Sequence, residues 1–241
     1  MKRPKIICHI LMSIDGRIAG DFFRLPEPGK AAVEYRNLRG GFNGEAIIYG
    51  RTTAEEVLTK GHAPDLSAYG NVVLRREDFI ADNSAVNYLA VLDPEGGLGW
   101  TKPVVEGRGP GYDGAHIVEL LTEKVPDAYL AYLQKIGVSY LFCGTDTLSC
   151  AQAAEKLHEW FGVQTALLQG GGVANGSFAA EGLIDELSLV IVPALQGGGA
   201  PCLIETAQGL KVPQAYTVCD LYPLPGGGIR LHYCRKQAKK S

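Results

Sequence analysis

The stretch that most constrains this chain is Thr165–Gly182, TALLQGGGVANGSFAAEG, where an apolar run leads through three glycines into a helix-forming segment. Ala166–Leu168 is predicted to end a buried strand, and Val173–Ala180 to form a helix that Gly182 stops. The first N–H groups of such a helix have no internal partner and carry partial positive charge. The segment therefore predicts a phosphate site. A tight turn that only requires positive φ is the alternative.

The type of phosphate site can be narrowed from what surrounds the glycines. No Gly-Lys-Ser/Thr follows them, which excludes a Walker-type loop. The spacing of Gly170, Gly172 and Gly176 approaches a relaxed Rossmann pattern. However, the acidic residues Asp185 and Glu186 precede the next apolar run instead of ending it. A dinucleotide site remains the interpretation, outside the strict Rossmann motif.

A second strand–helix junction repeats this logic. Glu45–Tyr49 predicts a short strand, and the residues Gly50, Arg51, Thr52 and Thr53 lead into a helix at Ala54–Lys60. In this interpretation the glycine permits close approach, a threonine caps the helix, and the arginine forks onto a phosphate. Two such junctions favour a ligand with two phosphates, and Arg51 suits an extra 2′-phosphate. The alternative is an ordinary N-cap beside a surface arginine.

Composition sets the broad class. The 241 residues are 46% hydrophobic and 20% charged, which predicts one globular domain over residues 1–241. A net charge of −3 argues against nucleic acid as a partner. No apolar run is long enough for a membrane span, and the N-terminus predicts a strand better than a signal peptide. The expected location is therefore the cytoplasm.

Cysteine and histidine usage predicts neither disulfides nor metal. The six cysteines are scattered without a CxxC motif, and the five histidines show no metal-ligand spacing. We therefore expect reduced thiols and no structural metal.

The order of segments predicts an α/β fold: a mainly parallel central sheet with helices on both faces and a C-terminal antiparallel hairpin. The expected strands are Lys5–Met12, Glu45–Tyr49, Asn71–Leu74, Tyr88–Leu92, His116–Leu121, Val138–Cys143, Ala166–Leu168, Leu183–Pro193 and the hairpin strands Ala215–Leu221 and Ile229–Cys234. Three further helices are expected besides the two above. The first begins at Gly29, after a loop at Phe22–Pro28, and the other two span Pro126–Ile136 and Leu148–Trp160.

Polar residues near the first strand are candidates for a substrate site. Asp15 lies in the turn after Lys5–Met12, where α/β sheets place ligands, although an Asx-type turn before glycine is the alternative. Glu34 and Arg39 lie on the helix that follows. On most surface helices such charges are only solvated.

Four stretches of the chain, MSIDGRIA, YRNLR, AIIYGRTTAEEVL and LLQGGGVANGSFAAEGLIDELSLVIVP, resemble the dihydrofolate reductase-like superfamily. The resemblance is closest to the reductase domain of the bacterial riboflavin-pathway deaminase/reductase and runs from about Lys5 to Arg235. The chain lacks the His-x-Glu…Cys-x-x-Cys signature of a zinc deaminase, so we expect a stand-alone reductase.

The resemblance implies an NADPH site and a small-molecule substrate. Gly50, Arg51, Thr52 and Thr53 would hold the adenosine-phosphate side, and Gly170, Gly171, Gly172, Val173, Ala174 and Asn175 the pyrophosphate. The family substrate is a pyrimidinone with a phosphoribosylamino group, and hydride goes to ribose C1 of its open imine. Asp15, and Arg39 as a phosphate partner, would lie on the substrate side. A homodimer is the family expectation.

Two positions leave the substrate open. Gln169 stands where the family usually has glutamate, and either contacts the substrate without that charge or only ends the strand. Glu34 lies sixteen residues before Gly50, similar to the pterin-binding carboxylate of dihydrofolate reductases, and is the candidate catalytic residue. The alternatives to pyrimidine reduction are therefore pterin reduction and a non-catalytic NADPH sensor.

Overall fold

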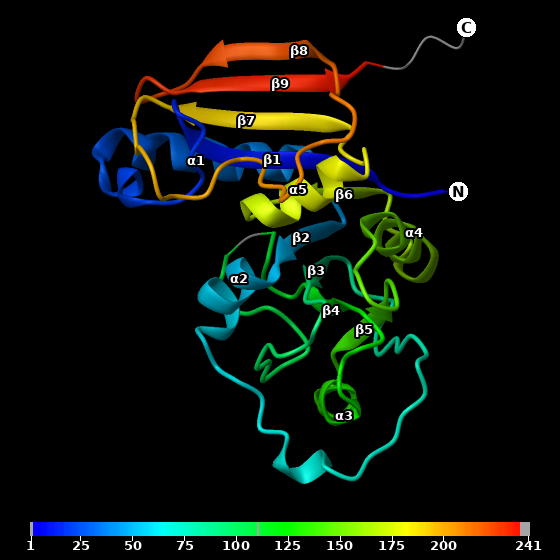
Figure 1. Cartoon of the computed structure of the whole chain (residues 1–241). Coiled ribbons are helices and arrows are strands. Elements are labelled where there is room, and N and C mark those ends of the chain that lie inside the picture. The colour runs from blue at the N-terminus through cyan, green and yellow to red at the C-terminus, as the bar shows by residue number, and fades with distance from the viewer. Residues whose placement is uncertain (1, 110, 237–241) are drawn as a thin grey trace, which may run out of the picture. The chain divides into compact units, whose positions relative to one another are not determined.

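The computed structural model describes residues 2–109 and 111–236 and divides the chain into two compact units (Figure 1). Unit 1 contains Gly44–Ala166 and the residues up to Pro4. Unit 2 contains Lys5–Asn43 and the chain from Leu167 onward. Strand β6, Thr165–Leu168, carries the chain from the first unit into the second.

Unit 1 contains four parallel strands. Their order is β5-β4-β3-β2, with the bounds β2 Ala46–Gly50, β3 Tyr88–Leu92, β4 His116–Leu121 and β5 Ser139–Phe142. The residues of β3, β4 and β5 are all buried, as is typical of parallel strands covered on both faces. The helical segments are α2 Arg51–Ala54, η2 Glu55–Thr59, η3 Ser67–Tyr69, α3 Asp127–Ile136 and α4 Cys150–Phe161.

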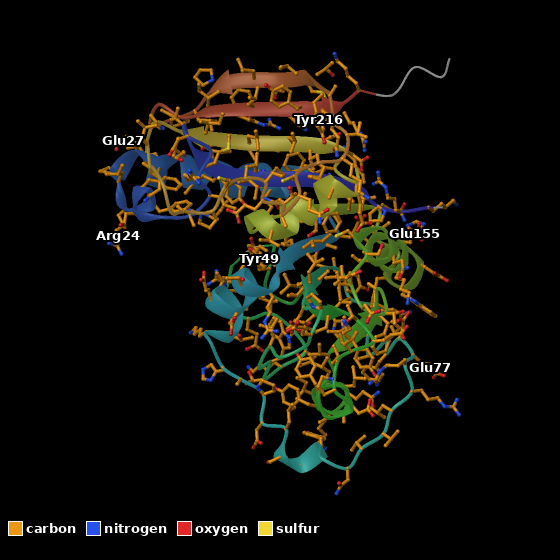
Figure 2. All side chains as sticks on the ribbon, in the orientation of Figure 1. Arg24, Glu27, Tyr49, Glu77, Glu155 and Tyr216 are labelled. Atoms are coloured by element: carbon orange, nitrogen blue, oxygen red, sulfur yellow. A yellow bond between two sulfur atoms is a disulfide. The ribbon has the colours of Figure 1, made fainter. Side chains whose placement is uncertain are left out.

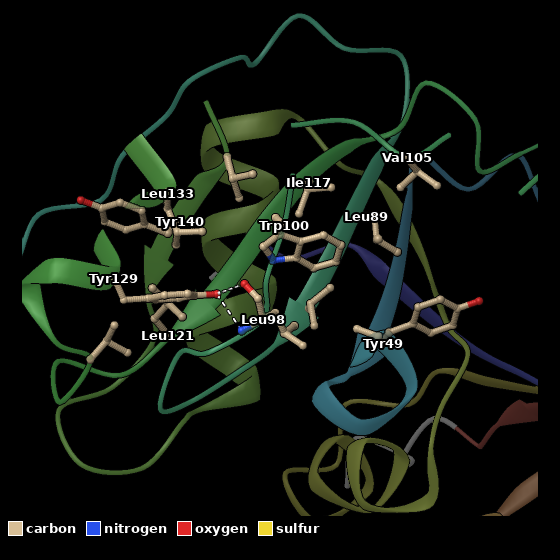
Figure 3. Close-up of a cluster of buried hydrophobic side chains, with 14 of the residues drawn as sticks. Tyr49, Leu89, Leu98, Trp100, Val105, Ile117, Leu121, Tyr129, Leu133 and Tyr140 are labelled. Carbon is tan, nitrogen blue, oxygen red and sulfur yellow. Dashed lines mark hydrogen bonds between the residues drawn. The ribbon is translucent and has the colours of Figure 1, made fainter. Parts of the chain in front are cut away.

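Helices cover both faces of this four-stranded sheet. Helix α3 contributes Tyr129, Leu130 and Leu133 to a cluster that also contains Ile117 and Trp100 (Figure 3). On the opposite side, the Phe161 ring of α4 packs on Tyr88 of β3, with ring centroids 4.8 Å apart. Adjacent strand residues point to opposite faces, so Tyr88 and Leu89 mark the two sides.

Unit 2 places the two ends of the chain in one sheet, in the order β1-β7-β9-β8 (Figure 1). Strands β1, Lys5–Ser13, and β7, Glu186–Val192, are parallel. Strands β9, Ile229–Arg235, and β8, Tyr216–Pro223, add an antiparallel hairpin. The helical segments are η1 Asp21–Arg24, α1 Pro26–Gly41 and α5 Gly172–Ala180.

Helices also lie on both faces of the unit 2 sheet. Leu11, Val190 and Val192 form a cluster with Ala31 of α1. Figure 2 shows Arg24 and Glu27 pointing away from the protein at the outer end of this helical region, where both are exposed. Ile10 points to the other face, where its Cδ1 lies 3.5 Å from the position that a Cβ on Gly170, just before α5, would occupy.

The predicted α/β class, with mainly parallel strands, helices on both faces and a C-terminal antiparallel hairpin, is confirmed. Two local predictions are wrong. Residues 71–74 form no strand. Val73 is 88% exposed because no neighbouring strand pairs with this short apolar run in the described part of the chain. Helix α1 begins at Pro26 instead of Gly29, because proline fits the first helical turn. The single domain over residues 1–241 stays a prediction.

The expectation that all thiols are reduced is wrong for one pair. Cys219 and Cys234 form a disulfide across the β8–β9 hairpin, next to a register shift between Val218 and Asp220. Cys8, Cys143, Cys150 and Cys202 form no disulfide among the described residues. Sequence spacing did not reveal the pair because the hairpin brings together residues 15 apart. Among the described residues, no helix is long and apolar enough to cross a membrane.

Candidate functional site

In unit 2, the candidate site lies at the carboxyl ends of the parallel strands β1 and β7. Ser13 and Val192 are register partners, and the Ile14 N–H donates to the Ala194 carbonyl at 2.9 Å. The side chains that follow these ends, Ile14 and Leu195, are 61% and 72% exposed. The carboxyl ends of parallel strands are where open α/β sheets bind ligands, so this exposed apolar pair suits a ligand surface.

Asp15 fastens the loop that follows β7. Its carboxylate accepts hydrogen bonds from the Ser13 hydroxyl at 2.6 Å and from the N–H groups of Gln196 and Gly197 at 3.1 and 2.8 Å. These bonds, with that of Ser13 first, lower the pKa of Asp15 to about 2. The carboxylate therefore ties the loop after β7 to the end of β1 and does not form the Asx-type turn, because the Arg17 N–H donates to the Ser13 hydroxyl instead. The predicted substrate contact of Asp15 stays a prediction.

The first of the three glycines is required by its own backbone. Gly170 has φ +95°, and the peptide bond between Gly170 and Gly171 is cis. Residues other than glycine rarely adopt such a φ. This matches the alternative of a turn that needs positive φ, and it is compatible with the phosphate interpretation as well.

Two further glycines of this segment are required by the chain itself. A Cβ on Gly172 would lie 2.4 Å from the Cys202 carbonyl oxygen, and one on Gly176 would lie 1.9 Å from the Glu205 carbonyl oxygen. The Glu205 N–H donates to the Gly172 carbonyl at 3.0 Å, and the buried Asn175 amide donates to the Leu203 carbonyl at 2.9 Å. The prediction that these glycines leave room for a ligand is therefore incomplete: the segment 202–205 occupies the space beside Gly172 and Gly176.

The start of α5 keeps the properties of an anion site. No side-chain hydrogen bond caps the helix within the described part of the chain, and its first turn contains no acidic residue. Gly171 is half-buried and Val173 is 66% exposed, so solvent reaches this turn. Uncapped N–H groups that solvent can reach are suited to bind a phosphate.

Gln169, the last residue before the glycines, belongs to a buried network. Its amide donates to the Tyr35 hydroxyl at 2.8 Å, and that hydroxyl donates to the His9 carbonyl at 3.1 Å. The Tyr35 ring stacks on the His9 ring with centroids 4.2 Å apart. Gln169 is only 7% exposed, so in this structure it anchors α1 to the strand end. Its substrate contact stays a prediction.

His9 makes this network sensitive to pH. Its Nδ1 lies 3.0 Å from the Ser188 hydroxyl and its Nε2 2.9 Å from the Tyr35 carbonyl, which requires the proton on Nε2. Burial lowers the pKa of His9 from 6.5 to about 4. The unfolded chain therefore takes up a proton between these values that the folded chain does not bind. We expect the free energy of unfolding to fall by about 3 kcal/mol as pH drops through this window.

The measurement is urea unfolding between pH 7 and pH 4 for the wild type and His9→Gln. The wild type should lose more stability than the variant over this interval, because glutamine does not titrate. His62→Gln, at an exposed position, is the matched control and should keep the wild-type slope. Parallel profiles for the wild type and His9→Gln would contradict the assignment.

Arg39 and Glu34 occupy different environments on α1. Arg39 is 9% exposed and lies close enough to His9 for its charge to contribute to the lowered pKa of that ring. Asp15 instead binds the loop at Gln196 and Gly197. Glu34 is half-buried, and no hydrogen bond or ion pair engages it among the described residues. Their roles toward a substrate stay predictions.

In unit 1, Arg51 is fixed by a buried carboxylate. Its Nη1 donates to Asp93 Oδ1 at 2.9 Å, and Asp93, which follows β3, is fully buried. The Arg51 side chain is 37% exposed, so part of the guanidinium faces solvent. An arginine held on one side by a carboxylate is prepositioned to bind an anion on the other. Asp93 was missed in the sequence because DPEGG reads only as a turn.

A second buried carboxylate lies beside this ion pair. Glu119 Oε1 accepts from the Trp100 indole, while Oε2 is buried without a partner among the described atoms. Burial, and then the charge of Asp93, raise the pKa of Glu119 well above its usual value. Burial also raises the pKa of Asp93, against the opposing charge of Arg51. The positive charge of Arg51 therefore offsets the negative charge of the buried carboxyl pair Asp93 and Glu119, and Glu119 favours its protonated form.

The rest of the Gly50–Thr53 segment is open to solvent. Gly50 is extended, with φ −81° and ψ 160°, and α2 begins at Arg51 without a side-chain cap. The predicted threonine cap is therefore wrong, because both threonines lie inside the helix. Thr52 is exposed and Thr53 half-buried, and neither hydroxyl has a partner among the described residues. Gly50–Thr53 belongs to unit 1 and Gly170–Asn175 to unit 2.

The arrangement of the strands and of the loops at their ends is the α/β fold of the dihydrofolate reductase-like reductase domains. Residues 114–219 match the family model described as the RibD C-terminal domain. This match confirms the resemblance predicted from the sequence and supports a reductase.

Solved structures show the same fold at low sequence identity. A pyrimidine reductase-like protein from Corynebacterium diphtheriae has TM-score 0.66 and 18% identity, over 98% of this chain and 93% of that one. The riboflavin biosynthesis reductase Rib7 of Saccharomyces cerevisiae has TM-score 0.55 and 14% identity, over 97% and 90%. A deaminase/5-amino-6-(5-phosphoribosylamino)uracil reductase from Thermotoga maritima has TM-score 0.56 and 14% identity. The match covers 97% of this chain but only 57% of the Thermotoga maritima protein.

Proposed function

We propose that the protein is an NADPH-dependent reductase of riboflavin biosynthesis, acting on 5-amino-6-(5-phosphoribosylamino)uracil or a related pyrimidine. The observation that carries the proposal is the uncapped start of α5 after strand β6, in a chain whose residues 114–219 match the RibD C-terminal domain model. Three solved structures of the same fold are described as a pyrimidine reductase-like protein, a deaminase/5-amino-6-(5-phosphoribosylamino)uracil reductase and a riboflavin biosynthesis reductase. A shared fold alone does not define the substrate, so the site residues must support it.

The cofactor proposal assigns two groups of residues. Gly170–Asn175 bind the pyrophosphate through the first N–H groups of α5. Gly50–Thr53 bind the adenosine-phosphate side, where Arg51, held by Asp93, takes the 2′-phosphate. NADPH supplies the hydride when bound. Its preference over NADH would rest on the solvent-facing part of the Arg51 guanidinium.

The substrate proposal uses the strand ends of unit 2. Ile14 and Leu195 offer an apolar surface, and Asp15 holds the loop that carries Leu195 in place. Hydride transfer to ribose C1 of the imine requires mainly that the acceptor carbon is positioned and water is excluded. These side chains provide the surface for that positioning.

Pterin reduction is the second candidate because of Glu34. This carboxylate is half-buried and has no partner in the described part of the chain, so it can accept two hydrogen bonds from a ring with adjacent donors. A protein of this kind would reduce dihydrofolate.

The deciding experiment follows NADPH oxidation at 340 nm with either the phosphoribosylamino-pyrimidine or dihydrofolate as acceptor. We expect oxidation with the pyrimidine and a product that carries a ribityl group. Glu34→Gln should keep this activity, whereas it should abolish dihydrofolate reduction if the pterin is the substrate. Tight NADPH binding with no oxidation by either acceptor would instead identify a sensor and overturn the proposed reaction.

A further inference from the structure

Strands β7 and β9 bring three potential metal ligands together in unit 2. The ligand atoms of Glu186, His232 and Cys234 all lie within 4.8 Å of one another, and all three residues are half-buried. Glu186 and Cys234 are register partners, and His232 lies two residues before Cys234, on the same face of the strand. His232 Nε2 is 3.0 Å from Glu186 Oε2.

A fourth potential ligand comes from the neighbouring strand. Cys219, at the irregularity of β8, is bonded to Cys234, with the two Cα atoms 6.0 Å apart. Reduction of this bond leaves two thiols beside one imidazole and one carboxylate. Two sulfur ligands, one nitrogen and one oxygen form a set that suits four-coordinate Zn²⁺. Linear spacing hides this set because its members lie on three strands.

We propose that the reduced form of the β8–β9 hairpin binds one Zn²⁺ ion through Cys219, His232, Cys234 and Glu186. A reductant of the dithiol or phosphine class first supplies two electrons to the disulfide, and two protons complete the thiols while the reductant is oxidised. Zn²⁺ then displaces both thiol protons to solvent and binds the thiolates. The disulfide and the metal site therefore exclude each other, since each uses both sulfur atoms.

The surroundings balance the charge of this site. Two thiolates and one carboxylate leave the Zn²⁺ complex with one net negative charge, and Lys5 Nζ lies 2.6 Å from Glu186 Oε1 to offset it. Binding through Nε2 puts the ring proton of His232 on Nδ1, where Arg230 Nη2 now lies at 3.4 Å, long for a hydrogen bond. Arg230 keeps its contacts with Asp220 and Tyr222 through Nη1 when Nη2 moves away.

The test uses the full chain reduced with a phosphine, freed of reductant without oxygen, and titrated with Co²⁺ and then Zn²⁺. We expect one equivalent of Co²⁺ with the visible and thiolate charge-transfer absorption of a tetrahedral sulfur site, and its loss when Zn²⁺ replaces it. The oxidised protein should bind more than about 100-fold more weakly, since losing even an outer-shell partner costs about 10–100-fold.

Matched variants distinguish the site from incidental thiol binding. Cys234→Ser and His232→Gln should lose the tetrahedral spectrum, whereas Cys202→Ser, at a free half-buried cysteine outside the cluster, should keep it. Far-UV circular dichroism checks that each variant folds. If a variant does not fold, the comparison of Co²⁺ binding between the oxidised and the reduced wild type decides the question. Equal Co²⁺ uptake by both forms, or an unchanged spectrum in His232→Gln, would overturn the proposal.

Discussion

Gly176→Ala should destabilise the protein by about 3 kcal/mol. The new Cβ would lie 1.9 Å from the Glu205 carbonyl oxygen and 2.7 Å from its carbonyl carbon, and both are backbone atoms that cannot turn away. Overpacking of this kind costs about 1–3 kcal/mol or more. The measurement is the midpoint and slope of urea unfolding.

Gly29→Ala is the matched control, because it also adds a methyl group to a helical glycine of unit 2. In α1 the added Cβ meets no heavy atom within 4 Å, so the variant should be more stable by up to about 1 kcal/mol. Opposite signs for the two substitutions are the expected result. Equal effects would show that the segment 202–205 does not pack against α5 as described.

Replacing Arg51 should remove the preference for NADPH. Under the proposed function, Arg51→Ala is expected to weaken NADPH binding by about 10- to 100-fold and NADH binding by about 3-fold or less, because hydrogen bonds to charged groups contribute about 1.5–3 kcal/mol. Arg51→Lys keeps a cation beside Asp93 and should fold normally while losing the forked contact. Fluorescence titration with both cofactors measures the effect.

Arg75→Ala is the control for a general change of charge, because Arg75 is 85% exposed in a surface pair with Glu77. It should bind both cofactors as the wild type does. Equal losses of NADPH and NADH in Arg51→Ala would remove the 2′-phosphate assignment. Unfolding of Arg51→Ala alone would show only that Asp93 requires its partner, so Arg51→Lys decides that case.

Much of the fold could be predicted because its signals are local. The buried strands read as apolar runs, such as Tyr88–Leu92 and His116–Leu121, and the structure has both at the predicted bounds. The run at 71–74 shows the limit of this signal. Its valines are exposed, because a short apolar run becomes a strand only when a neighbouring strand pairs with it.

The candidate site could be predicted only in part, because its contacts join distant residues. Asp93 and Glu119 come together because β3 and β4 pair in parallel, with Leu92 beside Leu120. The space beside Gly172 is taken by Cys202 and Glu205, about 30 residues away. The start of α5 was predicted because strand, glycines and helix are continuous in the chain.

The division of unit 2 between both ends of the chain bears on the order in which the nascent protein can assemble. His9 contacts its strand neighbour Ser188, which lies 179 positions further along the chain. On the ribosome, Gly44–Ala166 emerges as one uninterrupted piece, while Lys5–Asn43 must wait for β7. Pairing at such sequence separation is slow, since a long loop must close first. Strand β1 is therefore translated well before its partner β7, and chaperones would meet it exposed during that delay.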